Sequence, residues 1–159
     1  MRDFMQQVDV EMLVAQGRGL IDGERDPVAN AANLSALLFM SLTGLNWVGV
    51  YFRRGDELVL GPFQGKPACT RIALGAGVCG RAAAERRTLV VPNVNAFPGH
   101  IACDLASRSE IVVPLIDGDN LLGVLDLDSP LEDRFHDDDR RLLEAAAQLL
   151  VAGSDFPIA

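Results

Sequence analysis

Residues 111–129 read IVVPLIDGDNLLGVLDLDS and carry the clearest indication of the fold in this chain. Two apolar segments flank the polar stretch DGDN, which is the pattern of a β-hairpin with a tight turn. The second segment alternates, so Val124, Asp126 and Asp128 are expected on one face of their strand and Leu125 on the other. This hairpin predicts an antiparallel sheet.

A second hairpin is expected nearer to the N-terminus. WVGVYF at residues 47–52 and ELVLGPF at residues 57–63 are separated by the turn sequence RGD. Two shorter segments, TRIAL at residues 70–74 and TLVV at residues 88–91, predict further strands. The sheet is therefore expected to extend across most of the chain.

Helical patterns flank these strands. The first covers residues 4–20, and the second begins with Asp26 as N-cap and Pro27 at the first helical position. A short helix, GRAAAERR, is expected inside the sheet region, and the acidic residues 137–139 begin a last helix that ends near residue 151. The expected apolar positions are Phe4, Val8, Met12 and Leu13 in the first helix and Leu34, Leu37, Leu38 and Leu42 in the second.

This order predicts an α/β (α+β) fold. We expect a central antiparallel sheet, with the N- and C-terminal helices on one face and a ligand-binding loop side on the other. The length of 159 residues and the 49% hydrophobic content are typical of one globular domain. We therefore expect a single domain over residues 1–159.

The charge of the chain restricts its partners. The net charge is -8 and no run of Lys and Arg exceeds two residues, which disfavours nucleic acid and anionic membranes. The N-terminal sequence MRDFMQQVDVEML has acids where a signal peptide would be apolar, and no segment approaches a membrane span. We expect a cytoplasmic protein whose partner is a small molecule or another protein.

Residues 92–109 show no clear periodicity, and a loop this long usually binds or catalyses something. Cys103 lies in this loop, three residues after His100. The chain has two other cysteines, Cys69 and Cys79, and the spacing of the three matches no zinc pattern. They are either inert thiols that fill the interior or a reactive set.

Three acids are expected to converge on the C-terminal hairpin. Asp126 and Asp128 lie about 7 Å apart on one strand face, and Glu110 falls opposite or diagonal to them on the neighbouring strand. One interpretation is a solvated outer face of the sheet. The other is a site, because like charges raise one another's pKa and such a cluster favours a cation or a proton.

Trp47, Gly49 and Tyr51 share one face of the first hairpin. The glycine removes the central side chain, which would leave a gap between two aromatic rings where another group could approach. Ordinary packing of aromatics in a core is the alternative. A gap beside the acids would suit a small amphiphilic molecule.

The segment GAGVCG at residues 75–80 matches the GxGxxG fingerprint of dinucleotide binding. The helix after it is short, no parallel sheet is evident, and no acid lies near residue 95 for a ribose. The glycines are better explained as a tight turn that presents Cys79 near a helix start.

Five segments together resemble one family. GPFQGKPAC, GAGVCG, FPGHIACD, SRSEIVVPL and GVLDLDSP look like the free methionine-(R)-sulfoxide reductases, which are stand-alone GAF domains. The resemblance covers about residues 26–151 and includes all three cysteines and all three acids. It implies a GAF-like fold and an oxidoreductase that reduces free L-methionine-(R)-sulfoxide, without a cofactor or a metal.

The resemblance also assigns roles. It implies attack by a cysteine thiol on the sulfoxide, a sulfenic acid, an intramolecular disulfide and recycling by a thioredoxin-type dithiol. It leaves open which thiol resolves the sulfenic acid and whether the chain forms a homodimer. The implied residues are Cys103 as nucleophile, Cys69 as resolving thiol, Cys79 as a second candidate resolver, Glu110, Asp126 and Asp128 around the sulfoxide, and Trp47 with Tyr51 in the substrate pocket.

Two other functions fit parts of the sequence. A GAF-type module that senses a small metabolite would need the pocket but no reactive cysteine. A thiol redox sensor would need the cysteines, but neither the three acids nor the aromatic residues. Neither alternative uses all of these features at once.

Overall fold

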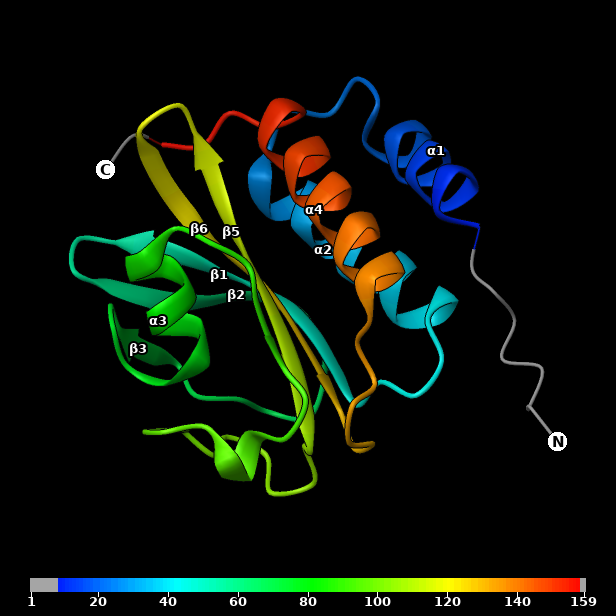
Figure 1. The fold of residues 1–159 in the computed structure, drawn as a ribbon. Helices are drawn as coiled ribbons and strands as arrows, with labels where there is room; N and C mark the ends of the chain where they lie inside the picture. Colours follow the sequence, from blue (N-terminus) through cyan, green and yellow to red (C-terminus); the bar gives the residue numbers. More distant parts are fainter. Residues whose placement is uncertain (1–8, 158–159) are drawn as a thin grey trace, which may run out of the picture.

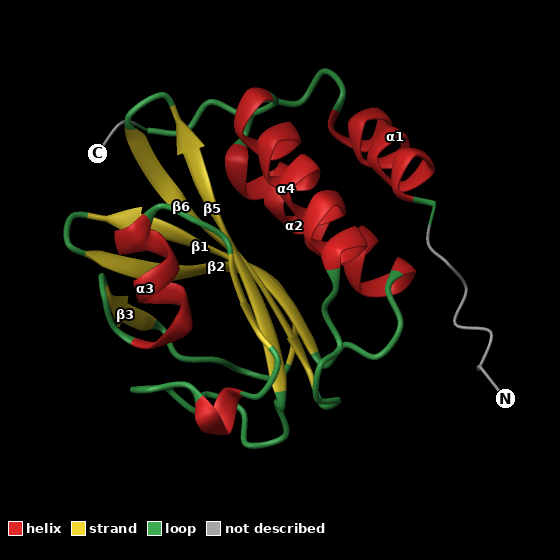
Figure 2. Ribbon diagram, viewed as in Figure 1, coloured by secondary structure: helices red, strands yellow, loops and turns green. Residues whose placement is uncertain are grey.

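The computed structural model describes residues 9–157, and this part of the chain forms one six-stranded antiparallel sheet with helices on both faces (Figures 1 and 2). The strand order is β3-β2-β1-β6-β5-β4. The helices are α1 (Val10–Ile21), α2 (Pro27–Ser41), α3 (Gly77–Glu85) and α4 (Asp137–Ala152), with a 3-10 turn at Val94–Ala96. The strands are β1 (Trp47–Arg54), β2 (Glu57–Gly65), β3 (Arg71–Ala73), β4 (Leu89–Val91), β5 (Ser109–Asp117) and β6 (Asn120–Ser129).

Two apolar clusters separate the faces of the sheet. Helices α2 and α4 cover one face, over the side chains of alternate strand residues such as Val50, Ile111 and Leu127, and α1 packs against these two helices. Helix α3 covers part of the other face, over Tyr51 and Val124. The predicted fold class is confirmed, and the loop side carries one short helix in addition to its loops.

Helix α2 begins as its sequence predicts. The carboxylate of Asp26 accepts hydrogen bonds from the backbone N–H groups of Val28 and Ala29, which have no partner inside the helix. Pro27 occupies the first helical position, where no N–H is needed. The predicted apolar face is confirmed, with Leu34, Leu38 and Leu42 buried and Leu37 partly buried.

Helix α1 differs from the prediction. Within the described residues it begins at Val10, after an N-cap bond from the backbone N–H of Met12 to the Asp9 carboxylate. Phe4 and Val8 lie outside the described residues. Met12 is 58% exposed, so its predicted place on the apolar face is wrong. The buried stripe is Leu13, Gly17 and Ile21, because Gly17 lets the helix approach α2 and α4 closely.

The register of the sheet places the acids as predicted. Glu110 on β5 pairs with Asp128 on β6, and Asp126 pairs with Gly49 on β1. Leu125 and Leu127 point to the opposite face, into the cluster beneath α2 and α4. The two-residue period of the strands therefore brings the three carboxyl groups to the α3 side of the sheet.

Among the described residues, no helix combines the length and the apolar character that crossing a membrane requires.

Candidate active site

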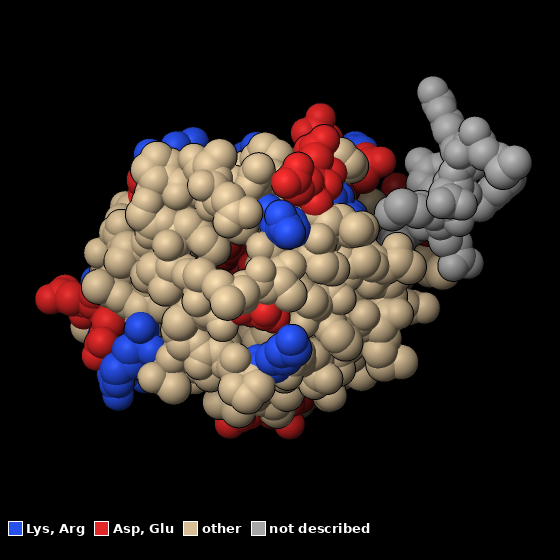
Figure 3. Space-filling view, turned by 90° about the horizontal axis from the view of Figure 1, so that it is seen from below, with Lys and Arg blue, Asp and Glu red and all other residues tan. Residues whose placement is uncertain are grey.

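A small cavity lies between the sheet, the start of α3 and the loop that contains Cys103. Its volume is about 40 Å³, which is room for a few water molecules. Figure 3 views the molecule from below Figure 1 and shows acidic atoms set back near the centre of this face, with mostly uncharged side chains around them and Lys or Arg atoms nearby. Eight residues that the sequence analysis singled out line this cavity: Trp47, Tyr51, Cys79, His100, Cys103, Glu110, Asp126 and Asp128.

Two of the three acids are buried and Asp128 is partly buried, so the solvated-face interpretation is wrong. Glu110 and Asp126 are each 5% exposed, and no Lys or Arg is among the described residues that line the cavity. Burial, and then the charges of Asp126 and Asp128, raise the pKa of Glu110 well above its ordinary value. Burial also raises the pKa of Asp126, to about 6. The cluster is thus suited to keep a proton near neutral pH.

Asp128 lies at the more open end of the cluster. Burial, followed by the charges of Asp126 and Asp104, raises its pKa well above the ordinary value, and a hydrogen bond with Ser107 opposes this shift. Asp104 belongs to the Cys103 loop and also lines the cavity. A fourth acid therefore stands beside the three that the sequence singled out.

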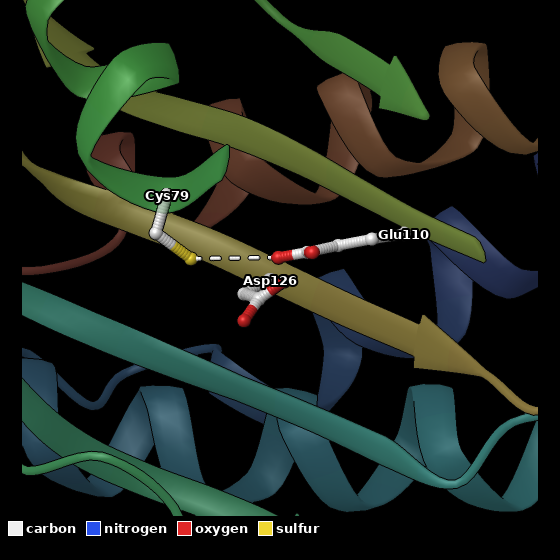
Figure 4. Close-up of side chains that lie close together, drawn as sticks. All are labelled: Cys79, Glu110 and Asp126. Atoms are coloured by element: carbon white, nitrogen blue, oxygen red, sulfur yellow. Dashed lines mark hydrogen bonds between the residues drawn. The ribbon is translucent and has the colours of Figure 1, made fainter. Parts of the chain in front are cut away.

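Cys79 is the thiol in direct contact with the acids (Figure 4). It lies in the first turn of α3, is 4% exposed, and donates to Oε1 of Glu110 over 3.8 Å. Burial raises the pKa of the Cys79 thiol, and the charges of Asp126 and Glu110 raise it further. Cys79 is therefore a weak nucleophile.

Cys69 and Cys103 form a disulfide, and Cys103 lines the cavity. Their Cα atoms are 5.6 Å apart, within the ordinary range for such a bond, although 34 residues separate them in sequence. Both residues are half-buried, in contrast to Cys79. The intramolecular disulfide that the resemblance implied is present in this structure.

Trp47 and Tyr51 form the aromatic wall of the cavity. The Trp47 indole N–H donates to the carbonyl of Lys66 over 3.1 Å, and the Tyr51 hydroxyl donates to the carbonyl of Cys69 over 2.9 Å. The second bond ties the aromatic wall to the backbone of a disulfide cysteine. Burial is also the main cause that raises the pKa of Tyr51, so the hydroxyl stays protonated.

The predicted gap at Gly49 is filled by neighbouring side chains. A Cβ atom on Gly49 would lie 2.4 Å from the Trp47 ring and 2.5 Å from Cβ of Phe63. The Trp47 ring stacks on Phe63 with 5.3 Å between centroids. The glycine therefore accommodates the protein's own tryptophan, and the expectation of an open notch between the rings is wrong.

The base of the Cys103 loop is fixed by a residue that sequence reasoning missed. The side-chain amide of Asn46 donates to Asp104 over 3.2 Å and to Ser107 over 3.1 Å. Asn46 immediately precedes β1, so this network links the loop to the strand that carries Trp47. No sequence pattern connects residues about 60 positions apart, and only the fold shows this contact.

His100 is a second missed residue, although its place before Cys103 drew attention to it. Its Nε2 lies 3.7 Å from Oε2 of Glu110, and burial lowers the pKa of the imidazole. Neutral imidazole can donate or accept a hydrogen bond at this carboxyl.

The GAGVCG segment forms the tight turn between β3 and α3, as predicted. Gly75 and Gly77 have positive φ values, and a Cβ on Gly80 would lie 2.3 Å from the carbonyl oxygen of Ala73. The helix has only nine residues and the neighbouring strands are antiparallel. The segment positions Cys79 against the acids.

Comparisons with known proteins place this chain. Residues 28–152 match the model of the GAF domain. Free methionine-R-sulfoxide reductase of Escherichia coli is 49% identical over 140 residues, covering 86% of this chain and 85% of that protein.

Solved structures agree. A putative GAF sensor protein from Burkholderia vietnamiensis superposes with a TM-score of 0.88 and 58% identity, covering 91% of this chain and 92% of the other. Free methionine-R-sulfoxide reductase from Neisseria meningitidis in complex with its substrate superposes with a TM-score of 0.87 and 45% sequence identity. This match covers 91% of this chain and 87% of the other. The fold, the disulfide and these similarities lead to one conclusion: the chain belongs to the GAF-domain family, among the relatives of the free methionine-(R)-sulfoxide reductases.

Proposed function

We propose that this protein reduces free L-methionine-(R)-sulfoxide to methionine, with Cys103 as the nucleophile. The observation that carries the proposal is a disulfide between Cys69 and Cys103 at the wall of a cavity that contains buried carboxyl groups. Reduction of a sulfoxide needs a thiolate and a proton donor in one place. The relatives that act on this sulfoxide support the choice of substrate.

The chemistry proceeds in two steps. The Cys103 thiolate attacks the sulfoxide sulfur, and in the resulting adduct the oxygen passes, with one proton, from the substrate sulfur to the Cys103 sulfur. The substrate S–O bond and the transient bond between the two sulfur atoms break, so that Cys103 becomes a sulfenic acid and methionine leaves. The Cys69 thiol then attacks the sulfenic sulfur, the disulfide forms, and the oxygen departs as water. Overall, two thiols lose two electrons and two protons, and the sulfoxide gains them.

The acid cluster supplies the proton for the first step. A sulfoxide oxygen is weakly basic, so the bond to sulfur breaks readily only when an acid stands beside it. Glu110 is the preferred donor, because it is buried between Asp126 and Asp128 and has no cationic partner from Lys or Arg among the described residues. Asp126 and Asp128 keep that proton in place and orient the substrate.

Substrate enters after the disulfide is reduced. While Cys69 and Cys103 are joined, the Cys103 sulfur at the cavity wall is oxidised and cannot attack the sulfoxide. Reduction breaks the covalent link between the loop that contains Cys103 and Cys69, which lies between β2 and β3. Trp47 and Tyr51 then offer the apolar wall for the S-methyl group.

A thioredoxin-type dithiol completes the cycle by exchange with the half-buried disulfide. Such a cycle requires a reducing compartment, and this supports the cytoplasm as the site of action. A homodimer stays a prediction that sedimentation can test.

A sensor is the second candidate function. The resemblance to a putative GAF sensor protein at 58% identity favours it. A sensor would bind its ligand unchanged, whereas the proposed enzyme consumes it. Conversion of the ligand therefore separates the two.

The test is a substrate comparison with the reduced protein and excess dithiothreitol. We expect methionine from free methionine-(R)-sulfoxide, and far slower reaction of the S epimer and of N-acetyl-methionine-sulfoxide amide, which mimics a peptide. The reason is the small size of the cavity and its buried carboxyl groups, which suit a single charged amino acid. Similar specificity constants for the free and blocked forms would contradict a pocket for a single amino acid.

A further inference from the structure

Cys79, Glu110 and Asp126 form a set of potential metal ligands that come from three different elements, α3, β5 and β6 (Figure 4). One ligand atom from each side chain lies within 4.8 Å of the others, and all three residues are buried. The spacing of these residues in sequence matches no metal motif. The set exists only because the sheet register and the α3 turn bring it together.

One atom of this set lacks a partner. Asp126 is 5% exposed, and its Oδ1 is fully buried with no hydrogen bond from the protein. The residue also lines the cavity. A carboxylate oxygen buried without a donor is costly, and native proteins usually satisfy such an atom with water or an ion.

The donor atoms suit a metal of the zinc class. Zinc binds thiolate sulfur at about 2.3 Å and carboxylate oxygen at about 2.1 Å, so tetrahedral coordination separates the two by roughly 3.6 Å. The observed distance from Cys79 Sγ to Glu110 Oε1 is 3.8 Å. A nitrogen donor stands close as well, since Nε2 of His100 lies 3.7 Å from the other oxygen of Glu110.

We propose that this cluster binds a divalent cation of the zinc class through Cys79, Glu110 and Asp126. Thiolate, imidazole and carboxylate are the donors that zinc takes in proteins. Calcium and magnesium, which require six or more oxygen ligands, do not fit this set. The cavity beside the cluster has room for an ion of this size.

The site has a consequence for the reaction, and this consequence rests on the proposed function. A bound cation occupies Glu110 and Asp126, the groups that would meet the sulfoxide. Cation and substrate therefore exclude one another, and zinc acts as an inhibitor of the reduction.

The oxidised protein allows a direct test. The chain has three cysteines, and the disulfide occupies two of them, so Cys79 is the one remaining thiol. Co²⁺ is the probe, because a cobalt–thiolate bond gives a charge-transfer band in the near ultraviolet. We expect this band to appear with one Co²⁺ per chain and to disappear when Zn²⁺ displaces the cobalt. No substrate or turnover is involved, so the result is independent of the proposed function.

Two variants locate the site. Cys79→Ser should lose the band, and Asp126→Asn, which keeps the size of the side chain, should weaken Co²⁺ binding by more than about tenfold, since even outer-shell changes cost 10- to 100-fold. The matched control is Asp138→Asn in the exposed acidic first turn of α4, which should bind like the parent. If circular dichroism shows that a variant is misfolded, the test relies on the parent protein, in which Zn²⁺ should displace Co²⁺ and remove the cobalt–thiolate band.

Three results would overturn the proposal: no band in the parent, a band that persists in folded Cys79→Ser, or loss of cobalt binding in Asp138→Asn. The last result would assign the cation to the surface of α4.

Discussion

Cys69 and Cys103 are joined by a disulfide whose Cα atoms lie 5.6 Å apart, and this bond closes a loop between residues 34 positions apart. The loop contains β3, α3 and β4, so it encloses the elements that cover the acid cluster. Oxidation of the pair therefore affects the stability of this half of the sheet as well as access to the cavity.

We expect the oxidised protein to be more stable than the reduced one by about 3–4 kcal/mol. Closing a loop of this length removes that much conformational freedom from the unfolded chain. Urea unfolding with and without a non-thiol reductant measures the difference. Cys69→Ser should show none, and an equal stability of both forms of the parent would refute the expectation.

The cysteines should differ sharply in a single turnover. Cys103→Ser removes the proposed nucleophile and should yield no methionine. Cys69→Ser retains it and should yield about one methionine per chain, then stall with thioredoxin as reductant. Quenched-flow measurement of methionine distinguishes the two, and a Cys103→Ser protein that still turns over would exclude Cys103 from the chemistry.

Glu110→Gln should slow the attack step by more than about 100-fold, which is the lower end of general-acid contributions. Binding of substrate should change less, because the amide keeps the shape of the side chain. Asp128→Asn, directly opposite on β6, should behave similarly. The matched control is Asp119→Asn, an exposed acid in the turn of the same hairpin, which should react like the parent.

Asp126→Asn should also lower activity, because the substitution removes a charge that raises the pKa values of Glu110 and Asp128. Rates like those of the parent in Glu110→Gln, Asp126→Asn and Asp128→Asn together would show that the acids serve no step of the reaction.

Gly49→Ala should displace the Trp47 ring. The new Cβ would lie 2.4 Å from that ring, and overfilling a tight interior costs about 1–3 kcal/mol. Trp47 is the single tryptophan, so its fluorescence reports the shift, and KM for the sulfoxide should rise. Gly19→Ala on α1 has nothing within 4 Å and should leave fluorescence and KM unchanged. Parent-like emission from Gly49→Ala would contradict the role of this glycine.

Much of the sheet could be predicted from the sequence, because a strand has a side-chain period of two and a short turn fixes the register. These two facts place Glu110 opposite or diagonal to Asp126 and Asp128, whereas its pairing with Asp128 depends on a register shift between Leu115 and Ile116 that the sequence pattern does not indicate. The N-cap at Asp26 is equally local, since it depends on neighbouring backbone N–H groups.

Other features depend on contacts between distant segments. The Trp47 ring fills the space over Gly49 because Phe63 on β2 supports it there, and the sequence pattern of β1 contains no trace of that neighbour. The bonds of Asn46 to Asp104 and Ser107 have the same character. The sequence pattern places Met12 on the buried face of α1, but the face that starts one residue later, at Leu13, is the one that packs against the protein.

The most direct test of the account is a stoichiometric reaction without recycling. Reduced protein, freed of reductant, is mixed with excess free methionine-(R)-sulfoxide, and both methionine and the positions of the lost thiols are determined by mass spectrometry. The account predicts about one methionine per chain, a Cys69–Cys103 disulfide and an intact Cys79 thiol. Absence of methionine, or methionine formed while Cys103 remains a free thiol, would contradict it.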